Sequence, residues 1–124
     1  MIEMRAAHYP GRAPIDAYGN GGFRFARMSH RGSLLCLPSG IYGWDAPAAI
    51  DVASLARVFA EAAEIEILLL GTGRELVPVA KPVRERLRAA QIVPEPMSTG
   101  AAVRTFNLLL AEARAVAAAL LAVD

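Results

Sequence analysis

The sequence has 124 residues, a net charge of +1 and a hydrophobic content of 55%. This length suits one domain with one core, and the hydrophobic content excludes a disordered chain. The balanced charge excludes a strongly basic nucleic-acid surface. We therefore expect residues 1–124 to form a single globular domain that does not bind nucleic acid.

Features that report on cell compartment point to the cytoplasm. The opening residues, MIEMRAAHYPGRAP, lack the hydrophobic core of a secretory signal. The apolar run from Ala115 to Val123 is far shorter than the ~20 residues that span a bilayer. Cys36 has no second cysteine with which to form a disulfide, which is typical of a reducing compartment. The sequence thus predicts a cytoplasmic chain that does not span a membrane.

The first half of the chain has β-strand patterns. Residues 21–28, GGFRFARM, alternate phenylalanine with arginine between glycines. A turn at 30–32 and an apolar strand at 33–38 follow, and we expect the two strands to pair. Because neither Asn-Gly nor Asp-Gly separates them, the expected hairpin has a longer loop. Residues 41–44 form another extended piece. The aromatic side chains of this half are interpreted as packing residues: Tyr18, Tyr42 and Trp44.

The second half alternates helices with strands. Residues 51–64 repeat apolar side chains at helical spacing, and Asp51 can cap this helix. Residues 65–70 form a continuous apolar strand, of the kind buried on both faces of a parallel sheet. A helix over 82–90 and a strand over 91–95 follow. Strand, helix and strand predict a β-α-β unit whose two strands are parallel.

Gly71-Thr72-Gly73 follows the apolar strand, where a dinucleotide enzyme would carry its phosphate-binding turn. In such a site the glycines lead directly into a helix. Here Pro78 and Pro82 delay the helix, and neither a third glycine nor Gly-Lys-Ser/Thr follows. We interpret these glycines as a backbone turn and predict no nucleotide or other cofactor.

A third helix, expected from residue 99 to 112, begins at the same edge of the sheet as the glycine turn, because both follow parallel strands. Ser98 or Thr99 can cap it. A helix N-terminus, a glycine turn and Arg104 would together suit a small anion or a partner's carboxylate. In the alternative reading, Arg104 and Asn107 only tie loops together. The candidate binding residues are Gly71, Thr72, Gly73, Ser98, Thr99, Arg104 and Asn107.

Other signs of catalysis or metal binding are weak. Cys36 lies in an apolar segment without a histidine nearby, which favours a buried small side chain over a nucleophile. His8 and His30 are isolated and lack the spacing of metal ligands. No Ser-His-Asp arrangement is readable. The sequence therefore favours a protein without a catalytic or metal site.

Several motifs together resemble the domain of unknown function 498. They are Tyr18, Gly22-Phe23, Gly32-Ser33-Leu34-Leu35, Pro38, Trp44, LLLGTG and MSTGAAVRTFNLLLAEAR, and the similarity runs over roughly residues 5–122. The resemblance implies a three-layer α/β fold with a mixed central sheet, whose last strand is antiparallel to its neighbours. It implies no established catalysis in the prokaryotic branch. The family includes a mitochondrial assembly factor of respiratory complex I, which implies a partner-binding role.

Two arguments disagree on the C-terminal segment. By propensity, AEARAVAAALLAVD continues the third helix. The resemblance instead implies a strand from Val116 to Leu121, and one helix from 99 to 122 would be unusually long for so small a domain. We expect the strand. The family has glycine where this chain has Ala113, which weakens the break expected between helix and strand.

Two functions remain open. In the first, the protein is a non-enzymatic binding or assembly module that contacts another protein near Arg104 and the glycine turn. In the second, it is a small-molecule (anion) binder or an unrecognised enzyme that uses the same corner. Leu108, expected on the helix face opposite the core, favours the first function as a possible contact residue.

Overall fold

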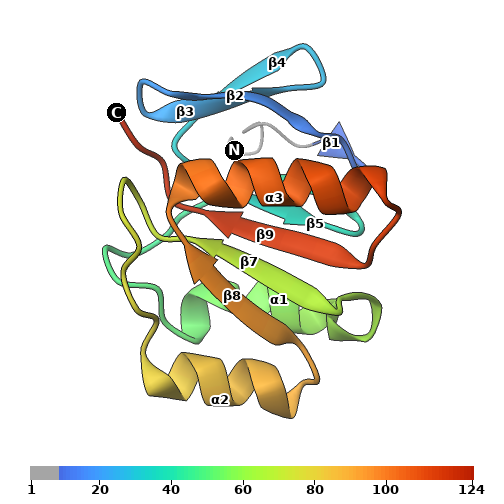
Figure 1. Ribbon diagram of the computed structural model, residues 1–124, viewed down its shortest axis with the longest axis vertical. Helices are drawn as coiled ribbons and strands as arrows, with labels where there is room; N and C mark the ends of the chain where they lie inside the picture. Colours follow the sequence, from blue (N-terminus) through green and yellow to red (C-terminus); the bar gives the residue numbers. More distant parts are fainter. Residues whose placement is uncertain (1–8) are drawn as a thin grey trace.

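Over residues 9–124, which the computed structural model describes, the chain forms two sheets and three α-helices (Figure 1). Its elements, with η for 3-10 helices, are β1 (Tyr9–Pro10), β2 (Ile15–Gly19), β3 (Gly22–Phe25), β4 (Met28–Arg31), β5 (Ser33–Leu37), β6 (Gly40–Trp44), η2 (Ala53–Leu55), α1 (Ala56–Ala60), η3 (Ala62–Glu64), β7 (Ile67–Gly71), α2 (Lys81–Ala89), β8 (Val93–Met97), α3 (Thr99–Ala111) and β9 (Val116–Leu120).

The large sheet is the middle of three layers. Its six strands lie in the order β1-β6-β5-β9-β7-β8. One hydrophobic core joins it to α1 and α2 through Val58 and Leu87. A second core, on the other face, joins it to α3 and to the small sheet β2-β3-β4 through Phe25 and Phe106. The three-layer α/β fold with a mixed sheet is therefore confirmed.

The N-terminal strands pair differently from the prediction. β3 pairs with β2 and β4, whereas β5 pairs with β6 and β9. The expected hairpin between residues 21–28 and 33–38 is therefore wrong. The expected turn at 30–32 is wrong for its first two residues, which belong to β4. At Gly32 the chain leaves the small sheet and enters the large one.

Two tight turns explain this pairing. Asn20-Gly21 joins β2 to β3, and Ala26-Arg27 joins β3 to β4. All four residues have positive φ, at 53°, 78°, 48° and 65° respectively. Two-residue hairpin turns of this kind are usually marked by Asn-Gly. The first turn carries that signal, so its hairpin was predictable; the second carries neither asparagine nor glycine.

Residues 51–64 form three short helical pieces instead of the one predicted helix. The central piece is α1, with η2 before it and η3 after it. Asp51 acts as the expected cap, because its carboxylate accepts a hydrogen bond from the Ser54 N–H at 2.8 Å. Ser54 returns the bond, accepting from the Asp51 N–H at 3.3 Å.

The predicted β-α-β unit is confirmed. β7 and β8 are parallel, and α2 connects them. Their boundaries differ from the predicted ones by one or two residues. Leu68 and Leu70 pack toward α1 and α2, whereas Leu69 packs toward α3. β7 is thus buried on both faces, as its continuous apolar sequence predicted.

The C-terminal strand is also confirmed, with one correction. β9 is fully buried and lies between β5 and β7. It runs antiparallel to β5 but parallel to β7, so the implied antiparallel direction is wrong on the β7 side. Burial in the centre of the sheet outweighs the helix propensity of its alanines.

The break between α3 and β9 forms without a glycine. Ala113 has a φ of 59°, a left-handed conformation that glycine usually occupies at a helix end. The Ala113 N–H donates to the Leu110 carbonyl at 2.9 Å, and the Arg114 N–H donates to the Leu109 carbonyl at 3.0 Å. This pair of bonds is a Schellman motif, and it ends the helix despite the alanine.

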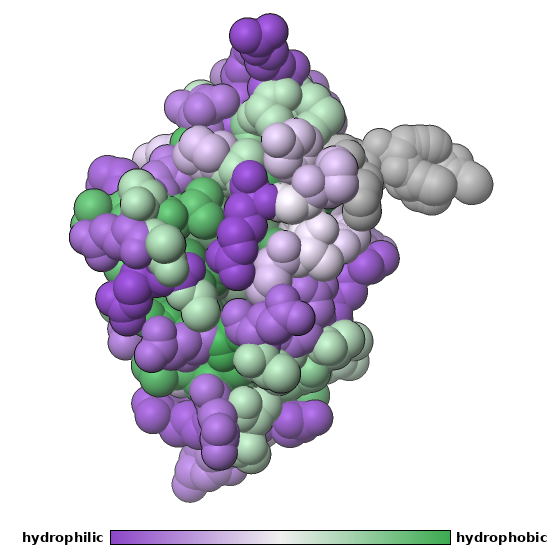
Figure 2. Space-filling view, turned by 90° about the vertical axis from the view of Figure 1, so that its right-hand side faces the viewer, coloured by the Kyte–Doolittle hydropathy of each residue, from purple (hydrophilic) through white to green (hydrophobic). Residues whose placement is uncertain are grey.

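Three mutually parallel strands, β8, β7 and β9, end at one edge of the large sheet. The start of α3, the loop after β7 and the C-terminal residues lie at this edge, on the left of Figure 1. Figure 2 shows the opposite side, where hydrophilic and hydrophobic side chains are intermixed. Among residues 9–124, no helix is long and apolar enough to cross a membrane.

Candidate functional site

The glycine turn and the start of α3 are joined by hydrogen bonds. The Thr99 N–H donates to the Gly73 carbonyl at 2.8 Å, and the Gly73 N–H donates to Thr99 Oγ1 at 3.0 Å. The same hydroxyl donates to the Leu121 carbonyl at 2.8 Å, and Thr99 is fully buried. The two loops therefore meet at the carboxyl edge of the sheet, where the sequence places them.

The outer residues of the turn are glycines for two different reasons. A Cβ atom on Gly71 would lie 3.0 Å from Leu120 Cδ2 and 3.1 Å from Thr99 Cα, so a side chain there would force its neighbours to shift by a few tenths of an ångström. Gly73 has open space around it but a φ of 110°, which side chains disfavour. Both glycines thus have structural explanations, in agreement with a backbone turn.

Thr72, between these glycines, shapes the loop that follows. Its hydroxyl accepts a hydrogen bond from the Val77 N–H at 2.8 Å. The hydroxyl donates toward the carbonyls of Glu75 at 2.8 Å and Met97 at 3.1 Å. Thr72 is therefore occupied by its own chain and is not available as a first contact for a ligand.

A hollow of about 280 Å³ opens beside the turn. Its walls include three predicted residues, Gly73, Ser98 and Arg104, and the further residues Tyr18, Arg74 and Asp124. Both arginines are exposed, and neither forms an ion pair within residues 9–124. Two guanidinium groups at one hollow can attract a carboxylate or phosphate, which would compete there with the Asp124 carboxylate.

The helix N-terminus contributes less to this hollow than the sequence suggested. Ser98 is the cap, and its hydroxyl accepts a hydrogen bond from the Ala101 N–H at 3.3 Å. The Thr99 N–H is already bonded to Gly73. Among the N–H groups of residues 99–101, the one of Gly100 has no acceptor in the described chain. An anion here would be held mainly by arginine side chains.

Asn107 does not line the hollow. Its carboxamide oxygen accepts a hydrogen bond from the Ile15 N–H, and its nitrogen donates to the Ile15 carbonyl, both at 2.8 Å. Asn107 therefore ties β2 to α3, which is the structural alternative that the sequence left open. The side chain of Arg104 forms no comparable hydrogen bond or ion pair within the described residues.

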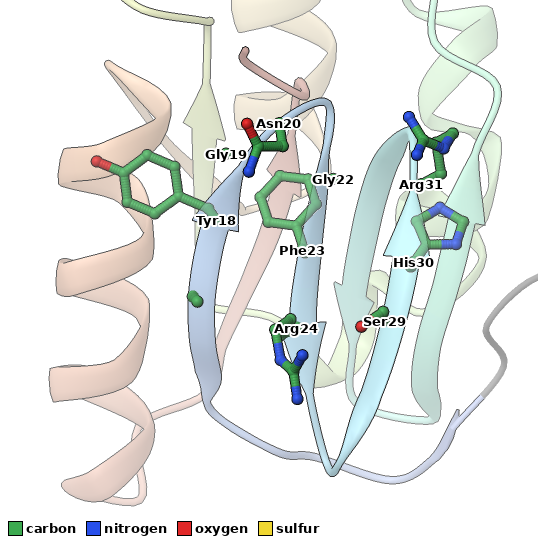
Figure 3. A pocket seen from close by; sticks show the side chains of 10 residues that line it. Tyr18, Gly19, Asn20, Gly22, Phe23, Arg24, Ser29, His30 and Arg31 are labelled. Carbon is green, nitrogen blue, oxygen red and sulfur yellow. The ribbon is translucent and has the colours of Figure 1, made fainter.

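Tyr18 lines this hollow, although the sequence pattern did not indicate it as a site residue. Its sequence context suggests a packing residue, but 43% of it is exposed. Its side chain reaches from β2 toward α3, and its hydroxyl occupies the space that a Cβ on Gly100 would need (Figure 3). A glycine within a helical pattern is the sequence signal of such a close approach.

A second hollow, of about 460 Å³, lies on the small sheet and shares Tyr18 with the first. Arg24 and Arg31 lie at opposite ends of it, on β3 and β4 (Figure 3). Neither arginine forms an ion pair in the described part of the chain. Tyr18 therefore stands between two hollows that are each lined by two arginines.

Cys36 is buried in β5, as predicted. Burial raises the pKa of its thiol above the ordinary range, so the thiolate that a nucleophile requires is disfavoured. His30 Nε2 lies 3.1 Å from the Ser33 carbonyl, within hydrogen-bond distance. His8 lies outside the described residues.

The chain belongs to a protein family of unknown function, DUF498/DUF598, whose model matches residues 15–121. The crystal structure of an outer membrane protein from Bartonella henselae is 59% identical, with a TM-score of 0.92, and the match covers 94% of this chain and 100% of that one. An uncharacterised protein of Rhodobacter capsulatus is 38% identical, over 94% of this chain and 90% of its own length.

NADH dehydrogenase [ubiquinone] 1 alpha subcomplex assembly factor 3 is also a relative. The Danio rerio protein is 33% identical over 86% of this chain, and the Mus musculus protein is 28% identical over 97% of it. The matches cover 63% and 66% of those two proteins. The chain thus corresponds to about two thirds of the assembly factors that it matches.

Proposed function

We propose that this protein is a non-enzymatic binding module that contacts another protein, in the cytoplasm, during the assembly of a larger complex. The observation that carries the proposal is the relationship to the assembly factors, which extends over 86% of this chain in the Danio rerio comparison. The family match at residues 15–121 includes both loops of the corner.

The chemistry of the corner supports a protein partner. Tyr18 is 43% exposed beside the hollow, and Arg74 and Arg104 lie at the same hollow without ion pairs in the described residues. Tyrosine and arginine are the residue types that most often dominate protein interfaces. The proposed contact is a carboxylate of the partner, held by the two guanidinium groups.

The test is cross-linked affinity purification of the tagged chain from its native host, with the captured proteins identified by mass spectrometry. We expect subunits of one complex to be enriched by the wild type and at least tenfold less by Arg104→Ala. Arg114→Ala is the matched control, because it removes an exposed arginine from a surface ion pair with Glu66, which is worth little. Equal capture by Arg104→Ala and Arg114→Ala would contradict the proposal.

The alternative function is a small-anion binder or an unrecognised enzyme at the same corner. The observation that favours it is the hollow itself, which carries two arginines and about 280 Å³ of space. A thermal-shift screen with phosphates, carboxylates and nucleotides separates the two functions. A shift that Arg104→Ala abolishes, without any captured partner, would favour the anion binder. We expect no shift with NAD, FAD or ATP, because the glycine turn does not lead into a helix.

A further inference from the structure

The loop between β7 and α2 exposes two adjacent large hydrophobic residues. Leu76 is 59% exposed and Val77 is 54% exposed, and Pro78 after them is exposed as well. Single exposed hydrophobic residues are ordinary, whereas adjacent ones can form part of a contact surface. The loop lies at the carboxyl edge of the sheet, on the left of Figure 1.

This loop is held in one shape by side-chain hydrogen bonds. Thr72 Oγ1 bonds to the Val77 N–H and the Glu75 carbonyl, both at 2.8 Å. At the other end, Arg84 Nε donates to the Val79 carbonyl at 3.1 Å. The apolar tip is thus ordered before any partner arrives, which lowers the entropy lost on binding.

A hollow of about 330 Å³ lies against the tip. Its lining is apolar except for one cation: Leu76, Pro78, Val79, Pro96 and Arg84. Pockets for small molecules and cofactors typically measure about 300–1,000 Å³, so this hollow is at the lower limit. Its size and lining suit one large apolar side chain with an acidic group beside it.

The charge of the neighbouring helix points to the same chemistry. Lys81 pairs with Glu85 on α2 at 3.8 Å. Arg84 and Arg88, one helical turn apart, have no acidic partner among residues 9–124. Like charges at this spacing repel each other, and an acidic side chain from outside would relieve the repulsion.

The edge strand beside the hollow does not favour strand addition. The Val93 N–H donates inward to the Glu66 carbonyl at 2.9 Å. The backbone N and C=O groups of successive residues alternate in direction along a strand, so those of residues 94 and 96 of β8 point away from β7. Both are prolines, which have no N–H to donate. A partner at this edge is therefore recognised by side chains and not by a shared sheet.

We propose that the tip Leu76-Val77-Pro78 and the hollow beside Arg84 dock a segment of a partner protein that carries a large apolar anchor next to Asp or Glu. The inference rests on the proposed function as a protein-binding module, and it adds the chemistry of the bound segment. The apolar anchor fills the hollow, and the acidic side chain faces Arg84 and Arg88.

The test is selection from a random peptide-display library against the purified full chain, followed by Kd measurement of the enriched peptides. We expect peptides with a large apolar residue near Asp or Glu. Leu76→Ser should weaken their binding at least tenfold, and Arg88→Glu should weaken it several-fold, more so at low salt. Ala111→Ser is the control, because Ala111 is an exposed apolar residue that lies on α3 and does not line this hollow. It should leave Kd unchanged.

Several outcomes would overturn the proposal. They are the absence of enriched peptides, peptides insensitive to Leu76→Ser, self-association of the chain that Leu76→Ser abolishes, and binding to anionic vesicles that Leu76→Ser abolishes. The last two would assign the tip to a second copy or to a lipid surface. Peptides that require Arg104 but not Leu76 would leave the proposed function standing and overturn this docking site alone.

Discussion

The phenol of Tyr18 lies over Gly100, in the space that a Cβ atom on that residue would need. Glycine inside a helix is destabilising by roughly 0.5–1 kcal/mol relative to alanine. Gly100 therefore lowers the stability of α3, but it leaves the space in which the phenol of Tyr18 lies against the helix.

This relationship predicts a coupling that a double-mutant cycle measures. In the Tyr18→Ala background, Gly100→Ala should raise the free energy of unfolding by up to about 1 kcal/mol, because alanine favours the first turn of α3 more than glycine does and no phenol occupies the space of its Cβ. With Tyr18 present, the same substitution should bring a smaller gain or a loss. Urea unfolding of the four proteins checks this, and equal effects in both backgrounds would show that the two residues are not coupled.

The helix ends offer a second prediction. Gln91, with a φ of 64°, ends α2 in the same motif that Ala113 forms after α3. Ala113→Gly and Gln91→Gly should each stabilise the protein by about 0.5–1 kcal/mol, since they remove a left-handed strain of roughly 1–2 kcal/mol but make the unfolded chain more flexible. Ala111→Gly, at the last residue of α3, is the control and should destabilise by up to about 1 kcal/mol, because alanine has the higher helix propensity. A destabilising Ala113→Gly would contradict the role of this conformation.

Thr72 should act through its hydroxyl. Thr72→Val removes the acceptor of the Val77 N–H, so the amide of Val77 should exchange hydrogen faster and the free energy of unfolding should fall by about 1 kcal/mol. Thr72→Ser keeps the hydroxyl and should restore slow exchange. Hydrogen exchange followed by NMR makes the comparison; identical rates in Thr72→Val and wild type would mean that the loop is held by other contacts.

The buried thiol of Cys36 should make stability depend on alkaline pH. Burial raises the pKa of this thiol in the folded state, so the stability it contributes is complete below the unfolded pKa of about 8.5 and is lost as pH rises above it. The loss is about 1.4 kcal/mol per pH unit. Cys36→Ala should lower the free energy of unfolding by roughly 1 kcal/mol near pH 7, but the variant has no thiol and so does not show this loss at alkaline pH.

The difference in unfolding free energy between wild type and Cys36→Ala should therefore shrink as pH rises from 8 and reverse its sign before pH 10. Chemical denaturation at several pH values measures it. A difference that stays constant, or rapid labelling of the native protein by a thiol reagent, would show that the thiol is not buried as described.

The elements decided by local pattern were predictable from the sequence. The continuous apolar run of β7 and the helical spacing of α2 and α3 led to the parallel β-α-β unit. Position at the carboxyl edge follows from topology, so the meeting of Gly73 with Thr99 could be expected from the order of strands and helices alone. The strand β9 required the family resemblance, because alanine propensity alone favours a helix.

The features that depend on contacts between distant residues could not be predicted in this way. Ala26-Arg27 forms a tight turn although neither residue is typical of one, since the flanking strands impose it. Asn107 pairs with the backbone of Ile15, far away in the sequence, and a polar residue on a helix gives no sign of its partner. The Thr99 N–H, which the sequence suggested could bind an anion, instead donates a hydrogen bond to the carbonyl of Gly73.

The central claim is that Arg104 binds a partner's carboxylate at the corner and does not support the fold. The most direct measurement is the affinity of the captured partner for wild type and Arg104→Ala, taken together with urea unfolding of both proteins. The account predicts at least tenfold weaker binding and a change in unfolding free energy within about 0.5 kcal/mol, as for an exposed side chain without ion-pair partners among residues 9–124. Unchanged affinity, or an Arg104→Ala protein that unfolds, would contradict it.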